Sequence, residues 1–599
     1  MDYVTLSNLV RARASVFGGK TAMKRWTKDK TSWIPISWNE FADDVDTCSS
    51  ALASLGVAEG ERVGVFSQNM PEVLTVNFAV YSNRAVAVPL YATSSAAQVA
   101  YIVNDAAIRI LFVGEDYQLE TALQVLDSCP TLETVIVFDP DAKAEGRGVM
   151  TMASFMATGK GLPCASLVAE RRARSAETDL VDILYTSGTT GEPKGVMLHQ
   201  SNYTQAFVNH DQRLTPLTAD DVAMDFLPLT HIFERAWTYF CFHKGVMVCV
   251  NTHPTDIQEA IAQVRPTVMC SVPRFWEKVY TAVRSKMSAS RGIVRLMMFD
   301  ALHVGKLCNI DYLSKGKRPP LLLALKYRFY ERTIYSRLRR IIGIERGNFF
   351  PTAGAAVPDK VFEFCRAVGI RLIVGYGLTE STATVSFTDF DHYVIGSVGE
   401  VMPNVSVRIA EDGEIQLKGA TVTAGYYNKP EANRQAFTDD GWFRTGDAGR
   451  LEGGILYLTD RIKDLYKTSN GKYIAPQSIE SALVVDRFID QICVIADRRK
   501  YVSALIVPDF PNLEAYARDH DIAFADRQAL LSDQRIMDMM ARRIDRLQRK
   551  FAHYEQVKRF TLLPSPFTMA KDELTNTLKV RRQVVAEHYA DVIDSMYDD

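Results

Sequence analysis

The chain carries its most informative segment at residues 182–196, which read DILYTSGTTGEPKGV. An apolar strand-like run leads directly into a segment rich in glycine and hydroxyl side chains. Glycines let backbone N–H groups approach an anion closely, hydroxyl groups donate hydrogen bonds, and Lys194 adds positive charge. The pattern therefore predicts a buried strand that ends in a phosphate-binding loop.

The loop differs from the phosphate loop of P-loop ATPases and kinases. That loop has Gly directly before its Lys and Ser or Thr directly after it. Here Lys194 stands between Pro193 and Gly195, so the P-loop class is excluded. A polar hairpin tip without a ligand is the alternative interpretation of the same residues.

Short apolar runs separated by helix-length segments extend on both sides of this loop. The runs are RVGVFSQ (62–68), AVAVPLY (85–91), IRILFVG (108–114), ETVIVFD (133–139), VMVCV (246–250), TVMCSVP (267–273) and IRLIVGYG (370–377). Continuous β-branched runs of this length are typical of strands that are buried on both faces of a sheet. We predict a large N-terminal α/β domain of packed sheets and helices.

A joint is expected in the polar segment 460–473, DRIKDLYKTSNGKY. Beyond it, residues 491–509 predict two strands around a turn, and a charged helix is expected over about 532–551. We predict an N-terminal domain over 1–462 and a small, mobile α+β C-terminal domain over 463–599.

Composition restricts the class of protein. The chain has 599 residues, of which 47% are hydrophobic and 23% are charged, as in folded globular proteins. With 69 basic and 71 acidic side chains the net charge is −2, so no overall field attracts nucleic acid. Nine cysteines without a CxxC pair favour reduced thiols in a cytoplasmic protein. No apolar run reaches the length of about 18 residues that a membrane span requires.

The segment 284–346 is the exception to this balance. It carries fifteen Lys or Arg against four acidic residues around the apolar run LLLAL at 321–325. We expect a mostly helical insertion. Its charge fits a solvated helical face, and it also fits contact with a membrane surface or with the phosphates of coenzyme A.

Five further motifs follow in order along the chain. They are LPLTHIFER (227–235), GYGLTES (375–381), RTGD (444–447), DRIKDLYKTSNGKYIAP (460–476) and LTNTLKVRR (574–582). Together with TSGTTGEPKG, they make the sequence similar to the AMP-forming acyl-CoA synthetases among the adenylate-forming enzymes. The length and the basic insertion resemble the long-chain fatty acid branch found in bacteria.

The resemblance implies a reaction in two halves. A long-chain fatty acid and MgATP give acyl-AMP and pyrophosphate, and coenzyme A then displaces AMP to give acyl-CoA. Two alternatives stay open: a fatty acyl-AMP ligase that loads a carrier protein, and a non-catalytic, membrane-associated lipid-binding protein. The location expected for the enzyme is the cytoplasm, with peripheral contact at the inner face of the membrane as a further option. The oligomeric state is left open.

The segment GYGLTES places an aromatic ring and a carboxylate beside the predicted loop. An aromatic face can stack on adenine, and a carboxylate oxygen can hold Mg²⁺. The resemblance implies that Tyr376 contacts adenine, Thr379 the phosphates, and Glu380 with Thr186 the metal. It implies nucleotide contacts for a wider set: Thr186, Ser187, Gly188, Thr189, Thr190, Gly191, Lys194, Gly354, Ala355, Gly375, Gly377, Asp447 and Arg461.

The remaining roles also come from the resemblance. His231 is placed at the carboxylate site, although a lone histidine is more often a core residue. Trp276 matches an aromatic gate of the acyl tunnel beside Gly354, and core packing explains Trp276 equally well.

The C-terminal domain is expected to alternate between the two half-reactions. The resemblance implies that it rotates about Lys463, delivers Lys579 for adenylation and then brings Gly471 to the coenzyme A tunnel. Three other cations in the same region compete with Lys579 for the catalytic role: Lys571, Arg581 and Arg582.

Overall fold

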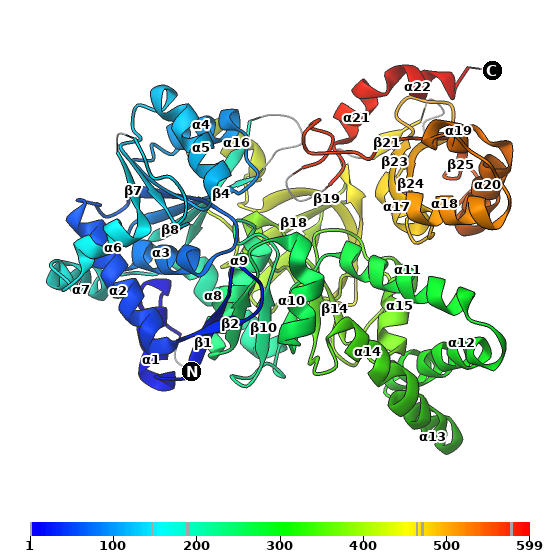
Figure 1. Ribbon diagram of the computed structural model, residues 1–599, viewed down its shortest axis with the longest axis horizontal. Coiled ribbons are helices and arrows are strands. Elements are labelled where there is room, and N and C mark those ends of the chain that lie inside the picture. Colours follow the sequence, from blue (N-terminus) through cyan, green and yellow to red (C-terminus); the bar gives the residue numbers. More distant parts are fainter. Residues whose placement is uncertain are drawn as a thin grey trace.

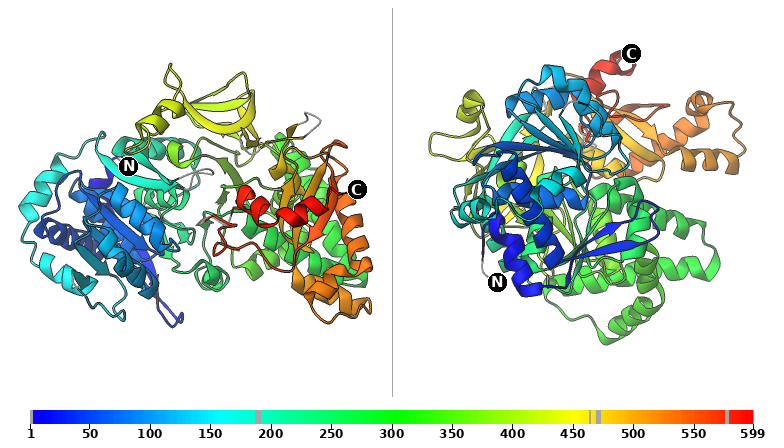
Figure 2. Two further views of the ribbon diagram at one scale, coloured as in Figure 1. Left: turned by 90° about the horizontal axis from the view of Figure 1, so that it is seen from above. Right: turned by 60° about the vertical axis from the view of Figure 1, so that its left-hand side comes forward.

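The computed structural model describes residues 3–146, 148–186, 192–462, 465–468, 473–575 and 579–598. A large body holds most of the chain, and a smaller C-terminal unit lies at one end of it (Figure 1). Figure 2 shows the blue strands of the first sheet on the opposite side of the molecule from the orange and red C-terminal elements.

The first large sheet has seven strands in the order β7-β6-β5-β3-β4-β8-β9, and only β9 is antiparallel to its neighbour. Helices cover both faces, with α2, α3 and α6 on one face and α4 and α5 on the other. The strands are Arg62–Ser67 (β3), Val86–Tyr91 (β4), Ile110–Val113 (β5), Thr134–Val137 (β6), Val149–Thr151 (β7), Leu180–Thr186 (β8) and Lys194–His199 (β9). The helices are Trp38–Ser54 (α2), Pro71–Ser82 (α3), Ala96–Asp105 (α4), Asp116–Val125 (α5) and Met152–Gly159 (α6).

The second sheet has five strands in the order β12-β10-β11-β1-β2. Its hydrophobic core is continuous with that of the first sheet through α1, α8 and α9. The strands are Thr21–Trp26 (β1), Trp33–Ser37 (β2), Val222–Asp225 (β10), Met247–Val250 (β11) and Val268–Met269 (β12). The helices are Leu6–Phe17 (α1), Gln200–Arg213 (α8) and Ile232–Lys244 (α9).

The third sheet has eight strands in the order β13-β14-β15-β16-β20-β19-β18-β17. All of its pairings are antiparallel except that of β13 with β14. The strands are Phe350–Thr352 (β13), Leu372–Tyr376 (β14), Ser386–Phe387 (β15), Glu400–Val401 (β16), Val405–Ile409 (β17), Glu414–Gly419 (β18), Phe443–Glu452 (β19) and Ile455–Arg461 (β20).

The C-terminal unit has its own hydrophobic core, formed by residues between Ile474 and Met596. The core surrounds a three-stranded sheet of Ile489–Ile495 (β23), Val502–Pro508 (β24) and Val557–Leu562 (β25). Its helices are Pro476–Leu483 (α17), Phe510–Asp519 (α18), Arg527–Ser532 (α19), Gln534–Gln548 (α20), Arg582–His588 (α21) and Ala590–Ser595 (α22). The predicted fold class, a large α/β body and a small α+β unit, is confirmed. The boundary after residue 462 stays a prediction, because Lys463 lies outside the described residues.

The basic segment forms an arm of helices that projects from the large body (Figure 1). It contains Pro273–Ala289 (α11), Gly292–Lys306 (α12), Leu321–Tyr330 (α13) and Ser336–Ile342 (α14), with π-helical turns at Leu307–Tyr312 and Glu331–Tyr335. The arm packs against α15 (Asp359–Ala367), where the Lys306 Nζ donates to Glu363 Oε2 at 3.0 Å. No helix in the described part of the chain is long and apolar enough to cross a membrane.

A fully buried ion pair joins the first sheet to α9. The Arg235 guanidinium donates to both carboxylate oxygens of Asp182, at 2.9 and 3.0 Å, and also to the Leu229 carbonyl at 3.1 Å. The Tyr81 and Tyr203 hydroxyls donate to the same carboxylate at 2.9 and 2.5 Å. Because every charge here has hydrogen-bond partners, the pair fixes β8 relative to the segment that precedes α9.

Removing one partner of this pair should destabilise the protein strongly. We expect Arg235→Met to lower the free energy of unfolding by about 3–5 kcal/mol, since it leaves the Asp182 charge buried without a cation. Thermal unfolding followed by circular dichroism measures the loss. Arg450→Met, at an exposed ion pair with Glu452, is the control. An equal effect of both substitutions would contradict this account.

Candidate functional site

The β8–β9 hairpin presents the predicted phosphate-binding residues that the structure describes. Thr186 ends β8 opposite Lys194 at the start of β9, and the Thr186 hydroxyl donates to the Lys194 carbonyl at 3.4 Å. The Lys194 Nζ lies 5.1 Å from the centroid of the Tyr426 ring. The other five loop residues, Ser187, Gly188, Thr189, Thr190 and Gly191, lie outside the described residues.

The carboxylate of Glu380 lies beside this hairpin. Glu380 belongs to a 3₁₀ turn, Thr379–Ser381, that follows β14. The Tyr426 hydroxyl donates to its Oε1 at 2.9 Å, and the Thr423 N–H donates to its main-chain oxygen at 2.7 Å. Burial raises the pKa of the Glu380 carboxyl. Tyr426 therefore connects the carboxylate with Lys194 across two distant parts of the sequence.

Tyr376 and Asp447 meet on the third sheet. The Tyr376 hydroxyl donates to Asp447 Oδ2 at 2.7 Å, and the Arg461 Nε lies 3.4 Å from Asp447 Oδ1. Burial, and then the Asp447 charge, raise the pKa of Tyr376. The structure thus brings together an aromatic ring, a carboxylate and a cation, the set that was predicted to hold adenine and ribose.

Gly377 and Gly354, both in the predicted nucleotide-contact set, differ in how much space surrounds them. A Cβ on Gly377 would lie 1.8 Å from the Ala383 carbonyl oxygen, so the turn after β14 requires a residue without a side chain. Gly354 has φ of +89° with no atom within 4 Å of an added Cβ. Gly354 and Ala355 lie in an exposed loop, which leaves space beside their backbone.

His231 lies on the large body, and a charge of the C-terminal unit, that of Lys579, acts on it. His231 caps α9, and its Nδ1 accepts the Phe233 N–H at 3.2 Å. Burial, and then the positive charge of Lys579, lower the pKa of His231 to about 4. The backbone of Lys579 pairs with Thr575, whose hydroxyl accepts the Lys579 N–H at 3.1 Å. His231 is therefore neutral at physiological pH.

The three cations that compete with Lys579 for the catalytic role have other surroundings. Arg581 forms an ion pair with Asp572, and Arg582 forms one with Glu480, both within the C-terminal unit. Lys571 is exposed. The predicted hinge Lys463 and tunnel residue Gly471 lie outside the described residues.

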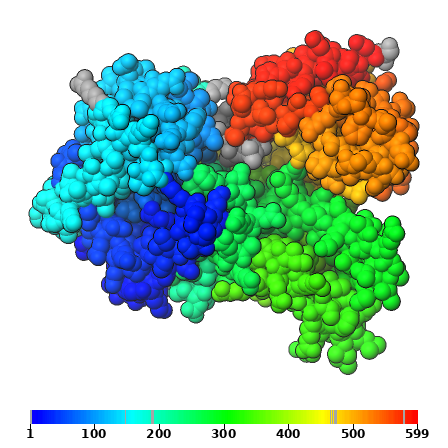
Figure 3. Space-filling model, viewed as in Figure 1, coloured from blue at the N-terminus to red at the C-terminus, as the bar shows by residue number. Residues whose placement is uncertain are grey.

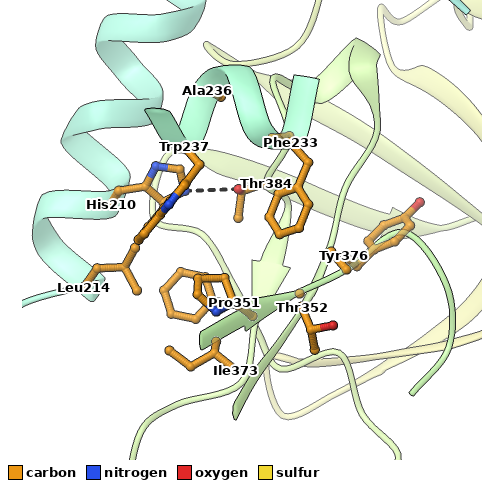
Figure 4. Close-up of a pocket in the computed structure, with 14 residues that line it drawn as sticks. His210, Leu214, Phe233, Ala236, Trp237, Pro351, Thr352, Ile373, Tyr376 and Thr384 are labelled. Atoms are coloured by element: carbon orange, nitrogen blue, oxygen red, sulfur yellow. Dashed lines mark hydrogen bonds between the residues drawn. The ribbon is translucent and has the colours of Figure 1, made fainter. Parts of the chain in front are cut away.

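An apolar cavity lies next to this site (Figure 4). Its volume is about 40 Å³, little more than the roughly 30 Å³ that one water molecule takes up in the liquid. Its walls come from α8, α9, β13 and β14. They are formed by His210, Leu214, Phe233, Ala236, Trp237, Pro351, Thr352, Ala353, Ile373, Gly375, Tyr376, Ala383, Thr384 and Phe387. Because Gly375 and Tyr376 line the cavity and are also predicted nucleotide contacts, the cavity lies beside that predicted set. A long alkyl chain requires side chains here to move.

Trp276 does not line this cavity. Its ring is fully buried, its Nε1 donates to the Ser271 hydroxyl at 2.8 Å, and it packs edge to face against Phe275 and Phe350. These contacts are those of a core residue. Its role as a gate stays a prediction.

The sequence interpretation missed a pair of buried carboxyl groups below His231. Burial raises the pKa of Asp225 and Glu234, and the neighbouring Asp225 raises that of Glu234 further. Asn69 Nδ2 donates to Asp225 Oδ1 at 2.6 Å, and the Leu227 N–H donates to Glu234 Oε2 at 3.1 Å. The pair therefore holds the segment that leads to His231. Glu234 lies within the quoted motif, but no pattern shows that its carboxyl is buried.

Comparison with known proteins gives the class. The sequence matches the family described as AMP-binding enzyme over residues 10–427, and the AMP-binding enzyme C-terminal domain over residues 463–599. The chain belongs to this family of adenylate-forming ligases, so the predicted membership is confirmed.

Two named proteins are similar to nearly the whole chain. A protein named long-chain-fatty-acid–CoA ligase FadD15 from Mycobacterium bovis is 34% identical over 94% of this chain and 93% of its own length. Long chain acyl-CoA synthetase 7, peroxisomal, from Arabidopsis thaliana is 29% identical over 94% of this chain and 82% of its own.

Solved structures share the fold at lower identity. The adenylation domain of a carboxylate reductase from Mycobacterium chelonae has a TM-score of 0.77 at 21% identity, covering 100% of this chain and 92% of that one. The anthranilate CoA ligase AuaEII, in complex with anthranoyl-AMP, has a TM-score of 0.74 at 18% identity, covering 99% and 98%. These similarities confirm the fold class.

The buried His210 in the cavity wall gives a prediction on pH. Its Nε2 lies 3.0 Å from the Thr384 Oγ1, and burial lowers the pKa of His210 to about 4. The pKa of a histidine in an unfolded chain is near 6.5. As the pH falls, the unfolded chain is therefore protonated at this position at a higher pH than the folded protein. The stability contributed by neutral His210 is therefore present above pH 6.5 and is lost toward pH 4, by about 3 kcal/mol.

His210→Phe should remove this part of the pH dependence. When the pH is lowered from 7 to 4.5, we expect the melting temperature of the wild type to fall more than that of His210→Phe. The exposed His553, replaced by Phe, is the control. Parallel curves for wild type and His210→Phe would disprove the assignment.

Proposed function

We propose that this chain is a long-chain fatty acid–CoA ligase that uses ATP and forms an acyl-adenylate. The observation that carries the proposal is a set of hydrogen bonds between residues far apart in the sequence, Tyr376 with Asp447 and Tyr426 with Glu380, next to an apolar cavity that Tyr376 also lines. Support also comes from the two relatives, which are named for this activity and match nearly the whole chain.

The first half-reaction joins the acid to the nucleotide. A carboxylate oxygen of the fatty acid attacks the α-phosphorus of ATP, the bond to the β-phosphate oxygen breaks, and pyrophosphate leaves. Negative charge builds up on the transferring phosphoryl group, and positioned cations stabilise it. Lys579 and Lys194 would supply these cations. Asp447 would accept hydrogen bonds from the ribose hydroxyls, with the Tyr376 ring against adenine.

A magnesium ion fits the chemistry of this site. Among the described residues no group of three or more His, Cys, Asp or Glu is arranged to hold a metal, and Mg²⁺ with nucleotides commonly uses one or two carboxylates plus phosphate oxygens. Glu380, whose pKa burial raises, would hold it with the Thr186 hydroxyl. When bound, Mg²⁺ neutralises phosphate charge and makes pyrophosphate a better leaving group.

The second half-reaction transfers the acyl group to coenzyme A. The thiolate attacks the acyl carbonyl carbon and AMP leaves with its bonding electrons. We propose domains at 1–462 and 463–599, with rotation about Lys463 that withdraws Lys579 and brings Gly471 to the tunnel. We place the enzyme in the cytoplasm, with contact to the inner face of the membrane through 284–346.

One experiment tests the activity. Purified protein, palmitate and MgATP should release pyrophosphate, and coenzyme A should give palmitoyl-CoA and AMP. ADP as the product, or no exchange of labelled pyrophosphate into ATP with any fatty acid, would refute the proposal. Acyl-AMP that accumulates and is used by a carrier protein but not by coenzyme A would favour an acyl-AMP ligase.

Lys579→Ala should separate the two half-reactions. We expect adenylation to fall by about 10²-fold or more, because a positioned cation is lost, while thioester formation from supplied acyl-AMP changes little. Gly471→Leu should show the reverse. The exposed neighbour Lys571, replaced by Ala, is the matched control. Equal losses in both half-reactions would argue against alternation of the C-terminal domain.

Glu380→Gln should change the response to magnesium. Glutamine keeps an oxygen that can accept the Tyr426 hydroxyl, but it removes the charge that would face the ion. We expect half-saturation of pyrophosphate exchange to need about tenfold more Mg²⁺, a loss on the order of 1.4 kcal/mol. Glu452→Gln, at an exposed side chain, is the control. An unchanged Mg²⁺ titration would exclude Glu380 as the metal ligand.

A further inference from the structure

Helix α13 shows an apolar stripe to solvent. The side chains of Leu321, Leu322, Leu325 and Phe329 are 75%, 82%, 51% and 51% exposed. Positions i, i+4 and i+8 lie on one face of an α-helix, so these residues form one continuous surface, here called the α13 stripe. Figures 1 and 3 show this helix at the far end of the projecting arm.

The rest of the arm holds α13 in place, so the stripe is not a consequence of a frayed helix. The Lys326 Nζ donates to Asp300 Oδ1 on α12 at 2.9 Å, and the Tyr330 hydroxyl donates to the same carboxylate. Tyr330 is only 5% exposed and packs against Tyr335. One face of α13 is therefore buried. The opposite face carries large apolar side chains that the rest of the described chain leaves exposed to solvent.

Cations surround the stripe. Lys317 and Arg318 precede α13, Arg328 lies on it and Arg332 follows it, and all four are exposed. None of the four forms an ion pair with any residue that the structure describes. Between residues 315 and 332 the chain has six basic side chains and one acidic one. An apolar stripe with a basic rim is the pattern of a helix that lies in the interface of an anionic bilayer.

A second copy of the chain is a poorer partner for this surface. Two α13 stripes in contact would bring two basic rims together, and like charges at an interface oppose association. A bilayer with anionic headgroups instead supplies an apolar interior and the opposite charge. The ten residues of α13 extend about 15 Å, which is too short to span a bilayer and long enough to lie in its interface.

We propose that α13 docks the protein on the surface of an anionic lipid bilayer. The α13 stripe inserts to the level where headgroups meet acyl chains, and Lys317, Arg318, Arg328 and Arg332 contact lipid phosphates. This surface lies outside the catalytic site, so the proposal does not depend on the ligase activity. It gives the enzyme access to a phase in which long-chain acids concentrate.

Sedimentation with vesicles tests the insertion. The full-length protein should bind mixed phosphatidylglycerol–phosphatidylcholine vesicles, and Leu322→Ser/Leu325→Ser/Phe329→Ser should weaken binding by about tenfold or more, because three apolar side chains no longer enter the interface. Ile34→Ser, at another exposed apolar side chain (51%), should bind as the wild type does.

Neutralising the rim tests the charge contribution. Arg318→Gln/Arg328→Gln/Arg332→Gln should lose on the order of fivefold in affinity per charge on the anionic vesicles, and little on pure phosphatidylcholine. All variants should exchange labelled pyrophosphate into ATP with palmitate at the wild-type rate without vesicles, and vesicle binding is measured without substrates, which separates this test from that of the ligase activity.

Three results would overturn the proposal. The first is wild-type protein that stays in the supernatant with anionic vesicles. The second is a triple serine variant that binds as well as the wild type. The third is a wild-type dimer in size-exclusion chromatography that the serine substitutions convert to a monomer, since a second copy of the chain would then cover the α13 stripe.

Discussion

The buried contact between Asp182 and Arg235 is the constraint on which the site depends. Asp182 lies in β8, four residues before Thr186, and Arg235 lies four residues after His231. With both side chains fully buried and 2.9 Å apart, the strand that leads to the predicted phosphate-binding loop cannot shift without moving the segment that presents His231. The pair is therefore the rigid link between β8 and the start of α9.

Hydrogen-bonded carboxyl groups extend this link. Glu234 accepts the Leu227 N–H, and Asn69 joins Asp225 to the same segment. Buried polar groups are stable only when partnered, and each partner restricts the backbone. The segment before α9 is thus fixed from several directions, whereas Lys579 belongs to a unit with its own hydrophobic core.

Much of the fold followed from local patterns. Apolar runs such as 108–114 and 370–377 became buried strands β5 and β14, because continuous β-branched runs can be covered only inside a layered α/β body. Tyr376 ends β14 and Glu380 follows it in a 3₁₀ turn, as the pattern of 375–381 suggested, whereas Asp447 lies within β19 and not after a strand. The apolar run 321–325 was noticed, but its exposure was not predictable, because helical periodicity does not say which face the rest of the chain will cover.

The sequence by itself determined the family, the order of the elements and the residue types that can bind a nucleotide, since these depend on spacing within short segments. Tertiary structure decided which side chains meet. Tyr426 on Glu380, Arg235 on Asp182 and Lys579 near His231 join positions from 46 to hundreds of residues apart, and such contacts arise only from packing. Burial likewise decided the protonation of His231, because the pKa depends on what surrounds the imidazole and not on its neighbours in sequence.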